Sequence, residues 1–369
     1  MKKVLKLILS VALLLAVAFV FTSCNRGDDE PATTQDEDAR IRIALIIHSP
    51  ETVLDDASFN EGSWNGIANF LTSQGLPLTA GEYRQFFHPH AADDAVRLDT
   101  IEQAIEWGAD VLILPGFQII NAVNEAQSMF PDVHFIVVDG EPSPINSNVL
   151  GLHFQENEAG FLAGYAAVRD GYTELGFMGG LSIPPVIRFG HGFILGAEHA
   201  ANQMGLEPGS ITINYHYLMT FAPGPEVVTA AGAWFVAGTE VIFAAAGGAG
   251  GSVMAAAEAN NGLVIGVDGD QSGFSDTVIT SAMKTMESSI AGFLTEILNG
   301  TFQGGRSVVL DASADGVGLP MATSRFNTFD QAMYDSLFAD IAAGRINVSN
   351  SEDMSEILAQ LTIVNVIEH

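Results

Sequence analysis

From Ile41 onward, the chain alternates between short apolar runs and longer segments whose apolar residues have helical spacing. Runs such as 41–49 (IRIALIIHS) and 109–116 (ADVLILPG) contain β-branched residues and few polar ones, which is typical of strands covered on both faces. The segments 57–75 and 97–108 place apolar residues three or four positions apart, as amphipathic helices do. This alternation predicts a parallel, doubly wound α/β sheet.

The alternation occurs twice along the chain. The strands expected in the first series are 41–49, 79–87, 109–116 and 133–141, and those in the second series are 149–155, 174–180, 211–220, 239–248 and 263–270. Two successive α/β lobes of similar length imply a cleft between them. Ligands meet such sheets at the carboxyl ends of the strands, so the informative residues should directly follow the apolar runs.

The N-terminus has the pattern of a signal peptide, expected over residues 1–23. Lys2, Lys3 and Lys6 precede the uncharged run 7–21, and small residues follow it. This run is shorter than the about 20 apolar residues usual for a membrane helix. Cys24 is the only cysteine and stands where cleavage would expose it, in a sequence (FTSC) similar to a bacterial lipobox. We expect Cys24 to be lipidated; an ordinary secreted protein or an uncleaved anchor are the alternatives.

Composition restricts the remaining possibilities. A single cysteine excludes internal disulfides and CxxC redox chemistry in the mature chain. Residues 24–40 are polar, acidic and without periodicity, which predicts a flexible, lipidated linker. The net charge of −30 argues against nucleic acid as a partner and against a polybasic membrane patch. It is typical of a solvated acidic surface, although a cationic ligand stays open.

Aromatic and acidic residues gather after the expected strands. Two aromatic faces, one from each lobe, could enclose a flat ring, and a carboxylate can accept hydrogen bonds from two vicinal hydroxyls. That combination suits a sugar carrying a planar base. A strand-end phenylalanine can instead be a core residue, and a strand-end aspartate can cap the next helix. The residues that follow the expected strands are Asp55, Asp56, Ser58, Phe59, Asn60, Phe117, Asp139, Phe221, Gly247, Gly248, Gly250, Gly251, Asp268 and Asp270.

Motifs for catalysis, cofactors and metals are weak. The sequence contains neither a GxSxG elbow nor an HExxH motif. Residues 247–251 (GGAGG) follow a strand but lack the GK[ST] ending of a phosphate loop. The segment 88–94 (HPHAADD) brings together His88, His90, Asp93 and Asp94, a set that is usually solvated on an exposed loop. We therefore expect no cofactor and no metal.

Several segments together resemble one family. They are 55–67 (DDASFNEGSWNGI), 156–167 (ENEAGFLAGYAA), 177–197 (FMGGLSIPPVIRFGHGFILGA), 241–257 (VIFAAAGGAGGSVMAAA) and 264–271 (VIGVDGDQ), followed by 278–284 (VITSAMK). In this order and spacing they look like the BMP (basic membrane protein) lipoproteins, which include PnrA-like purine nucleoside receptors. The resemblance implies a type I periplasmic binding protein, with two Rossmann-like lobes, parallel sheets and three interlobe crossings.

The resemblance also implies roles for individual residues. Phe59 matches the family's aromatic residue on one face of the base, and Phe221 the opposing ring. Asp268 matches the carboxylate that holds ribose hydroxyls, and Lys284 a basic residue on the ligand side of the cleft. The other matched positions are polar groups near the base and small residues that let the backbone approach the ligand: Asn60, Asp139, Gly247 and Gly248.

At the level of the whole protein, the resemblance implies an N-terminal lobe of residues 41–143 plus about 271–318. The C-terminal lobe then comprises 144–270 plus about 319–369. The function implied is that of a monomeric, lipid-anchored, extracytoplasmic component of an ABC importer. It would deliver a guanosine-, inosine- or adenosine-like nucleoside to permease and ATPase subunits. The alternatives are a nucleoside-sensing receptor and a nucleoside-cleaving enzyme on the same scaffold, for which Asp268 and Asp270 would be the candidate carboxylates.

Overall fold

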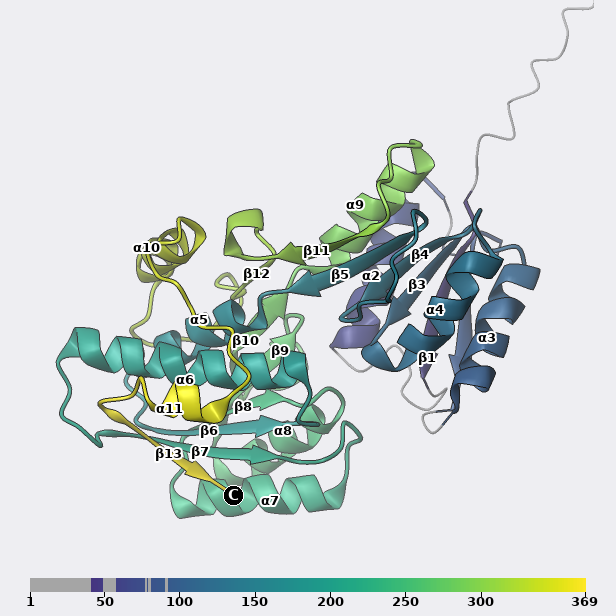
Figure 1. Ribbon diagram of the computed structural model, residues 1–369. Coiled ribbons are helices and arrows are strands. Elements are labelled where there is room, and N and C mark those ends of the chain that lie inside the picture. Colours follow the sequence, from purple (N-terminus) through teal and green to yellow (C-terminus); the bar gives the residue numbers. More distant parts are fainter. Residues whose placement is uncertain (1–40, 49–57, 77, 79–80, 90–91) are drawn as a thin grey trace, which may run out of the picture. The chain divides into compact units, whose positions relative to one another are not determined.

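Among the described residues, the first sheet contains six parallel strands. The structure, a computed structural model, describes residues 41–369 except 49–57, 77, 79–80 and 90–91. Each strand of the first sheet pairs in parallel with its neighbours (Figure 1). In spatial order the strands are β11 (Arg306–Leu310), β5 (Val149–Phe154), β4 (His134–Val138), β3 (Val111–Pro115), β1 (Ile43–His48) and β2 (Tyr83–His88).

Both faces of the first sheet are covered, which explains why its strands are apolar throughout. Along β1, Ile43 and Leu45 belong to one apolar cluster, whereas Ala44 and Ile46 belong to another. The first cluster includes residues of α2 (Phe59–Ser73) and α9 (Met286–Leu298), and the second includes residues of α3 (Asp94–Glu106) and α4 (Ile120–Met129). A strand with helices on both faces needs apolar side chains at successive positions.

The second sheet repeats this arrangement. Its spatial order is β12 (Val317–Gly318), β10 (Val278–Lys284), β9 (Leu263–Asp268), β8 (Val241–Ala245), β6 (Glu174–Gly179), β7 (Ile211–Tyr217) and β13 (Val364–Glu368). Only the pairing of β10 with β12 is antiparallel among these strands. The two sheets therefore share a strand order: β4, β3, β1 and β2 of the first correspond to β9, β8, β6 and β7 of the second.

Helices also cover both faces of the second sheet. Val241 and Phe243 of β8 share a cluster with residues of α5 (Glu156–Arg169) and α6 (Pro184–Met204). Ile242 of the same strand faces a cluster that includes α7 (Pro225–Ala237) and α8 (Ala249–Asn260). In the part of the chain that the structure describes, the remaining helical elements are η1 (Phe117–Ile119), η2 (Ala312–Ala314), α10 (Gln331–Ala342) and α11 (Met354–Leu358).

Helices α5 and α6 approach each other unusually closely through glycines. A Cβ at Gly160 or Gly164 of α5 would collide with backbone of α6, and a Cβ at Gly192 or Gly196 of α6 would collide with backbone of α5. Close-packed interiors do not absorb such overlaps cheaply, because neighbouring backbone must move. The glycines thus fix the start of α5 against α6, and this placement matters for the site described below.

The chain passes between the two sheets three times: between β5 and α5, between β10 and α9, and between β11 and β12. Backbone bonds join these crossings, from Gln155 N to Leu310 O (2.9 Å) and from Thr285 N to Gly316 O (3.0 Å). The two-lobe, parallel α/β fold expected from the sequence is confirmed.

The strand pairing differs from the expected lobe boundaries at two places. β5 was assigned to the C-terminal lobe, but it pairs with β4 and β11 of the first sheet. β10 was assigned to the N-terminal lobe, but it pairs with β9 of the second sheet. The first crossing therefore follows β5, and the second follows β10. An apolar run shows that a strand is buried, but it does not show which sheet the strand joins.

Some expectations concern residues outside the described part of the chain. These are the signal peptide, Cys24, the acidic linker and Asp56. Among the helices that the structure describes, none is both long and apolar enough to cross a membrane.

Candidate ligand-binding site

A cavity of about 400 Å³ lies at the carboxyl ends of strands from both sheets. This volume falls within the about 300–1,000 Å³ typical of small-molecule sites. The described residues that line the cavity are Ser58, Phe59, Asn60, Gly116, Phe117, Gln118, Asp139, Ile183, Pro185, Val186, Phe189, Phe221, Pro223, Ala245, Gly247, Gly248, Val267, Asp268 and Lys284. All the described residues to which the resemblance assigns a ligand role are in this set, whereas the strand-end candidate Asp270 is not, and contacts with a ligand stay predictions.

Phe59 and Phe221 come to the cavity from different sheets. Phe59 is the first residue of α2, which follows β1 of the first sheet. Phe221 lies between β7 and α7 of the second sheet. Both rings are only partly buried and pack against the edge of the largest apolar cluster.

Glycines determine where the Phe221 ring lies. A Cβ at Gly180 would overlap the ring itself, and a Cβ at Gly247 would lie 3.4 Å from its Cδ1. The carbonyl oxygen of Phe221 also accepts a hydrogen bond from Ala249 N (2.8 Å) at the start of α8. Gly247 thus lies beneath the aromatic ring, whereas a Cβ at Gly248 would lie 3.3 Å from the carbonyl oxygen of Phe221.

One wall of the cavity was not anticipated from the sequence. It comes from the segment entering α6 and from the first turns of that helix: Ile183, Pro185, Val186 and Phe189. These residues follow β6, so the rule that site residues follow strands could have identified them. Their apolar character, however, is equally typical of a helix that only packs on a sheet.

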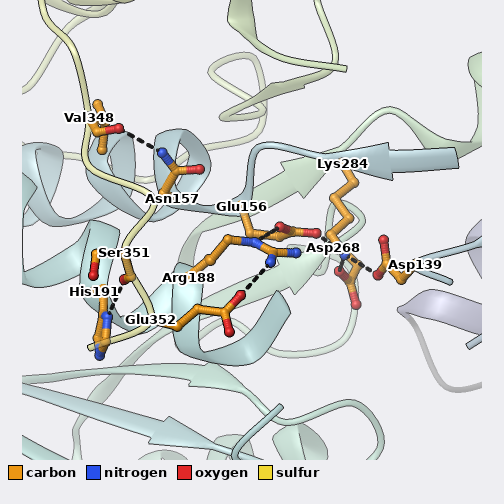
Figure 2. Close-up of polar contacts among 10 residues, drawn as sticks. All are labelled: Asp139, Glu156, Asn157, Arg188, His191, Asp268, Lys284, Val348, Ser351 and Glu352. Atoms are coloured by element: carbon orange, nitrogen blue, oxygen red, sulfur yellow. Dashed lines mark hydrogen bonds and ion pairs between the residues drawn. The ribbon is translucent and has the colours of Figure 1, made fainter. Parts of the chain in front are cut away.

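Lys284 lies at the centre of a buried group of charges (Figure 2). Its Nζ is 2.6 Å from Asp139 Oδ2, 3.0 Å from Glu156 Oε1 and 3.7 Å from Asp268 Oδ1. The side chain of Lys284 is only 2% exposed. Asp139 directly follows β4 of the first sheet and Asp268 ends β9 of the second, so one ammonium group binds carboxylates from both sheets.

The environment shifts the pKa values of this group in opposite directions. Burial raises the pKa of Asp139 to about 6, although the charge of Lys284 opposes this change. Burial alone would lower the pKa of Lys284, but the charges of Asp139, Glu156 and Asp268 outweigh it, and the pKa is raised. The lysine therefore stays charged, while Asp139 titrates in mildly acidic solution.

Ser58 completes the environment of Asp268. The Ser58 hydroxyl donates a hydrogen bond of 2.5 Å to Asp268 Oδ2. Ser58 directly precedes α2, which packs on the first sheet, so this bond also connects the two lobes. In contrast, Asp270 does not line the cavity. Its carboxylate accepts hydrogen bonds from Thr323 Oγ1 (2.6 Å) and Ser272 N (3.0 Å).

The candidate metal residues have other roles. Asp93 caps α3 by accepting a hydrogen bond from Val96 N (2.9 Å). Asp94 accepts hydrogen bonds from Arg97 Nη1 (3.1 Å) and from Asn121 Nδ2 (2.9 Å). His90 lies outside the described residues. Within the part of the chain that is described, no group of three or more His, Cys, Asp or Glu residues is arranged to hold a metal ion.

The fold and the interlobe cavity define a substrate-binding protein of the type I periplasmic binding class. Two solved solute-binding proteins of ABC transporters share the fold. One, from Aeropyrum pernix, has a TM-score of 0.69 at 19% identity and covers 86% of this chain and 96% of its own. The other, from Conexibacter woesei, has a TM-score of 0.66 at 24% identity and covers 84% of this chain and 99% of its own.

The sequence model of the Bmp family, described as ABC transporter substrate-binding protein PnrA-like, matches residues 41–351. The chain belongs to this family, as its motifs predicted. It is 28% identical to the ABC transporter nucleoside-binding protein BmpA of Lactococcus lactis, over 85% of this chain and 91% of that protein. It is 27% identical to basic membrane protein A of Borreliella burgdorferi, over 94% of this chain and 98% of that protein. It is therefore an ABC transporter substrate-binding protein.

Proposed function

We propose that the protein binds a purine nucleoside in the interlobe cavity and delivers it to an ABC permease. The observation that carries this proposal is the composition of the cavity wall. Phe59 and Phe221 reach it from different sheets, and the carboxylate of Asp268 lies in the same wall. A planar base and a ribose require these two kinds of group.

The two phenylalanines are suited to the base. Aromatic pairs in offset or edge-to-face geometry contribute about 0.5–1.5 kcal/mol beyond the burial of their area. Asp139 adds an acceptor, because its Oδ1 is buried and has no hydrogen-bond partner among the described residues. A buried acceptor without a partner is unfavourable, and an N–H group of a base would satisfy it.

Asp268 is suited to the ribose. Its side chain is 11% exposed, and its Oδ1 lies 3.7 Å from Lys284, beyond ordinary hydrogen-bond distance. Both carboxylate oxygens have further lone pairs for hydroxyl donors. Vicinal hydroxyls of a ribose would therefore compensate the cost of keeping this carboxylate in a closed cavity.

Transport is supported by family membership and by a relative with a matching name, the nucleoside-binding protein BmpA of Lactococcus lactis. Substrate-binding proteins of ABC transporters work outside the cytoplasm. We extend the proposal to a lipid anchor at Cys24 and to a monomeric protein with permease and ATPase partners. The anchor would keep the binding protein close to its permease.

We propose binding without cleavage. Hydrolysis of a glycosidic bond usually requires two positioned carboxylates. Asp139 and Asp268 both line the cavity, but both form ion pairs with Lys284, and the carboxylate of Asp270 is bound to Thr323 and Ser272. A nucleoside-sensing receptor would also bind without cleaving, but the match to ABC substrate-binding proteins favours transport.

Calorimetry of the purified protein with inosine, guanosine, adenosine and uridine tests the proposal, together with chromatography of the mixture for free base. We expect stoichiometric binding of at least one purine nucleoside and no release of base. Absence of binding to all nucleosides, or steady accumulation of free base, would refute it. Mass spectrometry of any nucleoside that co-purifies with the protein would identify the base.

A further inference from the structure

Glu156 is fully buried next to the cavity without lining it. It is the first residue of α5, directly after the first crossing from β5, and its side chain is 0% exposed. Fully buried glutamates are rare unless they are paired with cations. No catalytic or ligand-binding role of the kinds discussed above requires it, so its charge needs another explanation.

Each oxygen of Glu156 faces a cation (Figure 2). Oε1 lies 3.0 Å from Lys284 Nζ, and Oε2 accepts a hydrogen bond of 2.8 Å from Arg188 Nε. Arg188 also binds Glu352 at the protein surface through Nη1 (2.9 Å). Burial opposes ionisation of Glu156, but the charges of Lys284 and Arg188 outweigh it and lower its pKa. Glu156 is therefore a fixed negative charge behind Lys284.

Three carboxylates surround Lys284 and compensate its charge. A lysine ammonium group has three N–H donors and no acceptor. Asp139 accepts one hydrogen bond from Nζ (2.6 Å), and Glu156 Oε1 and Asp268 Oδ1 form ion pairs with it at 3.0 and 3.7 Å. An anionic ligand would therefore have to compete with these carboxylates for the charge of the lysine.

The remaining groups around the cavity give it a negative charge. Among the described lining residues, the ionisable ones are Asp139, Asp268 and Lys284, with formal charges that sum to −1. Adding the buried pair of Glu156 and Arg188 does not change this sum.

The helix N-terminus at the glycine-rich turn before α8 does not offset this charge. Backbone N–H groups at a helix start are a common anion site. At the start of α8, however, Ala249 N donates to Phe221 O (2.8 Å), Gly250 N to Gly247 O (2.9 Å) and Gly251 N to Gly248 O (3.2 Å). The first N–H groups of this glycine-rich turn are thus already bonded within the protein.

We infer that Glu156 is a positioning residue that holds Lys284 away from the ligand, so that the cavity accepts uncharged nucleosides and rejects nucleoside phosphates. The inference rests on the proposed function. It assigns the charge selectivity of the cavity to a residue that does not touch the ligand. A 5′-phosphate adds a charge of about −1.5 to −2 near neutral pH. In the low dielectric of a closed cavity, repulsion from the two aspartates is strong, and Lys284 cannot compensate it while Glu156 binds it.

The chain offers a matched control, Glu158, two residues further along α5. Its Oε2 accepts a hydrogen bond from Ala312 N (2.7 Å) at the third crossing, so it is also a structural carboxylate between the sheets. It forms no ion pair with Lys284 among the described contacts and does not line the cavity. Glu158→Gln removes a charge from the same turn of helix without releasing Lys284.

The experiment compares inosine with inosine 5′-monophosphate by calorimetry for wild type, Glu156→Gln, Glu156→Asp and Glu158→Gln. We expect wild type to bind the monophosphate about 100-fold or more weakly than inosine. Glu156→Gln should reduce this ratio about tenfold or more, because one buried negative charge is lost and Lys284 is released. Glu156→Asp and Glu158→Gln should keep a ratio close to that of wild type.

Salt dependence of the wild-type protein provides a second measurement, in case Glu156→Gln does not fold. Monophosphate binding should strengthen as salt is raised, because screening weakens repulsion, whereas inosine binding should not change. Three results would each overturn the inference. Glu156→Gln could weaken the binding of both ligands equally, wild type could bind the monophosphate tightly, or monophosphate binding could weaken as salt is raised. If wild type binds no nucleoside at all, the proposed function fails as well.

Discussion

Asp139 and Asp268 occupy corresponding positions in the two sheets and bind the same ammonium group. Asp139 directly follows β4 and Asp268 ends β9, the third strand of each sheet in spatial order. Both have a left-handed backbone, with φ of 54° and 64°, and both precede a glycine. Positive φ is uncommon outside glycine, although aspartate tolerates it better than most residues. Lys284 therefore joins two similar strand-end turns, one from each lobe.

The first prediction concerns the pH dependence of stability. Because burial raises the pKa of Asp139 from 3.8 to about 6, the folded state holds a proton between these values that the unfolded state has lost. The contribution of Asp139 to the free energy of unfolding therefore decreases as pH rises from about 4 to about 6, and is constant above this range. One pKa unit corresponds to about 1.4 kcal/mol, so the decrease should be on the order of 3 kcal/mol.

Urea denaturation of wild type and Asp139→Asn at several pH values measures this decrease. The free energy of unfolding of wild type minus that of Asp139→Asn should decrease as pH rises from about 4 to about 6.5. Asp132→Asn, at an exposed carboxylate, serves as the control. A difference that is flat over this range would show that Asp139 does not retain its proton in the folded state.

The second prediction concerns ribose. Removing a hydrogen bond to a charged group typically costs about 1.5–3 kcal/mol. Asp268→Asn should therefore weaken nucleoside binding by about tenfold or more, whereas free bases should bind poorly to both proteins. Asp270→Asn is the matched control, because Asp270 is bound to Thr323 and Ser272 away from the cavity. Calorimetry that shows equal affinity for hypoxanthine and inosine would remove the argument for ribose recognition.

Much of the fold could be predicted because burial on both faces leaves a direct pattern in the sequence. In β1, Ile43 to Ile47 are all buried and all apolar, and the run is readable as a strand. The assignment of β5 and β10 to sheets was wrong because neighbouring strands are chosen by tertiary contacts. β5 pairs with β4 because of how the chain connects and packs the two strands, and residues 149–154 alone do not encode this choice.

The candidate site could be predicted to the extent that its residues follow strands. Phe59, Asp139 and Asp268 satisfy this rule, and all three line the cavity. The buried charges behind them do not follow it. Glu156 begins a helix and Arg188 lies on another, positions where charged residues are usually solvated. Only their three-dimensional proximity shows that Glu156 binds Lys284 and Arg188 together.

A third prediction concerns attachment to the membrane, which depends on residues outside the described part of the chain. The sequence FTSC predicts a mature protein that begins at a diacylated Cys24. A protein anchored only by lipid loses its membrane affinity with the lipid. Cys24→Ala should therefore appear in the soluble fraction after signal cleavage. Membrane partitioning of the variant equal to that of wild type would contradict the lipid anchor.

The fourth prediction concerns the support of the Phe221 ring. A Cβ at Gly180 would overlap this ring, so Gly180→Ala should displace it from its present position in the cavity wall. Overpacking of this kind typically costs about 1–3 kcal/mol of stability. We expect nucleoside affinity to fall about tenfold as well, since one face of the base loses its partner. Gly251→Ala in α8, where a Cβ meets nothing within 4 Å, should change neither quantity appreciably.

The last prediction concerns Phe59, which either belongs to the core or forms one side of an aromatic clamp with Phe221. The ring lies 5.4 Å from Lys284 Nζ, is partly buried and lines the cavity. In the clamp interpretation, the ligand favours the state in which both ring faces of its base are covered, which is a shift of population toward that state. Phe59→Ala should then leave the melting temperature of the free protein nearly unchanged. It should weaken nucleoside binding and remove most of the stabilisation by ligand.

Phe154 provides the matched comparison. Its ring is 5.7 Å from the same Lys284 Nζ, but the residue is 2% exposed and does not line the cavity. Phe154→Ala should destabilise the free protein by about 3–5 kcal/mol, as removal of a core phenylalanine does. Melting curves of both variants, with and without nucleoside, distinguish the two roles. A large loss of stability in Phe59→Ala with near-normal affinity would place Phe59 with Phe154 in the core, because a clamp residue is needed only when a base lies against it.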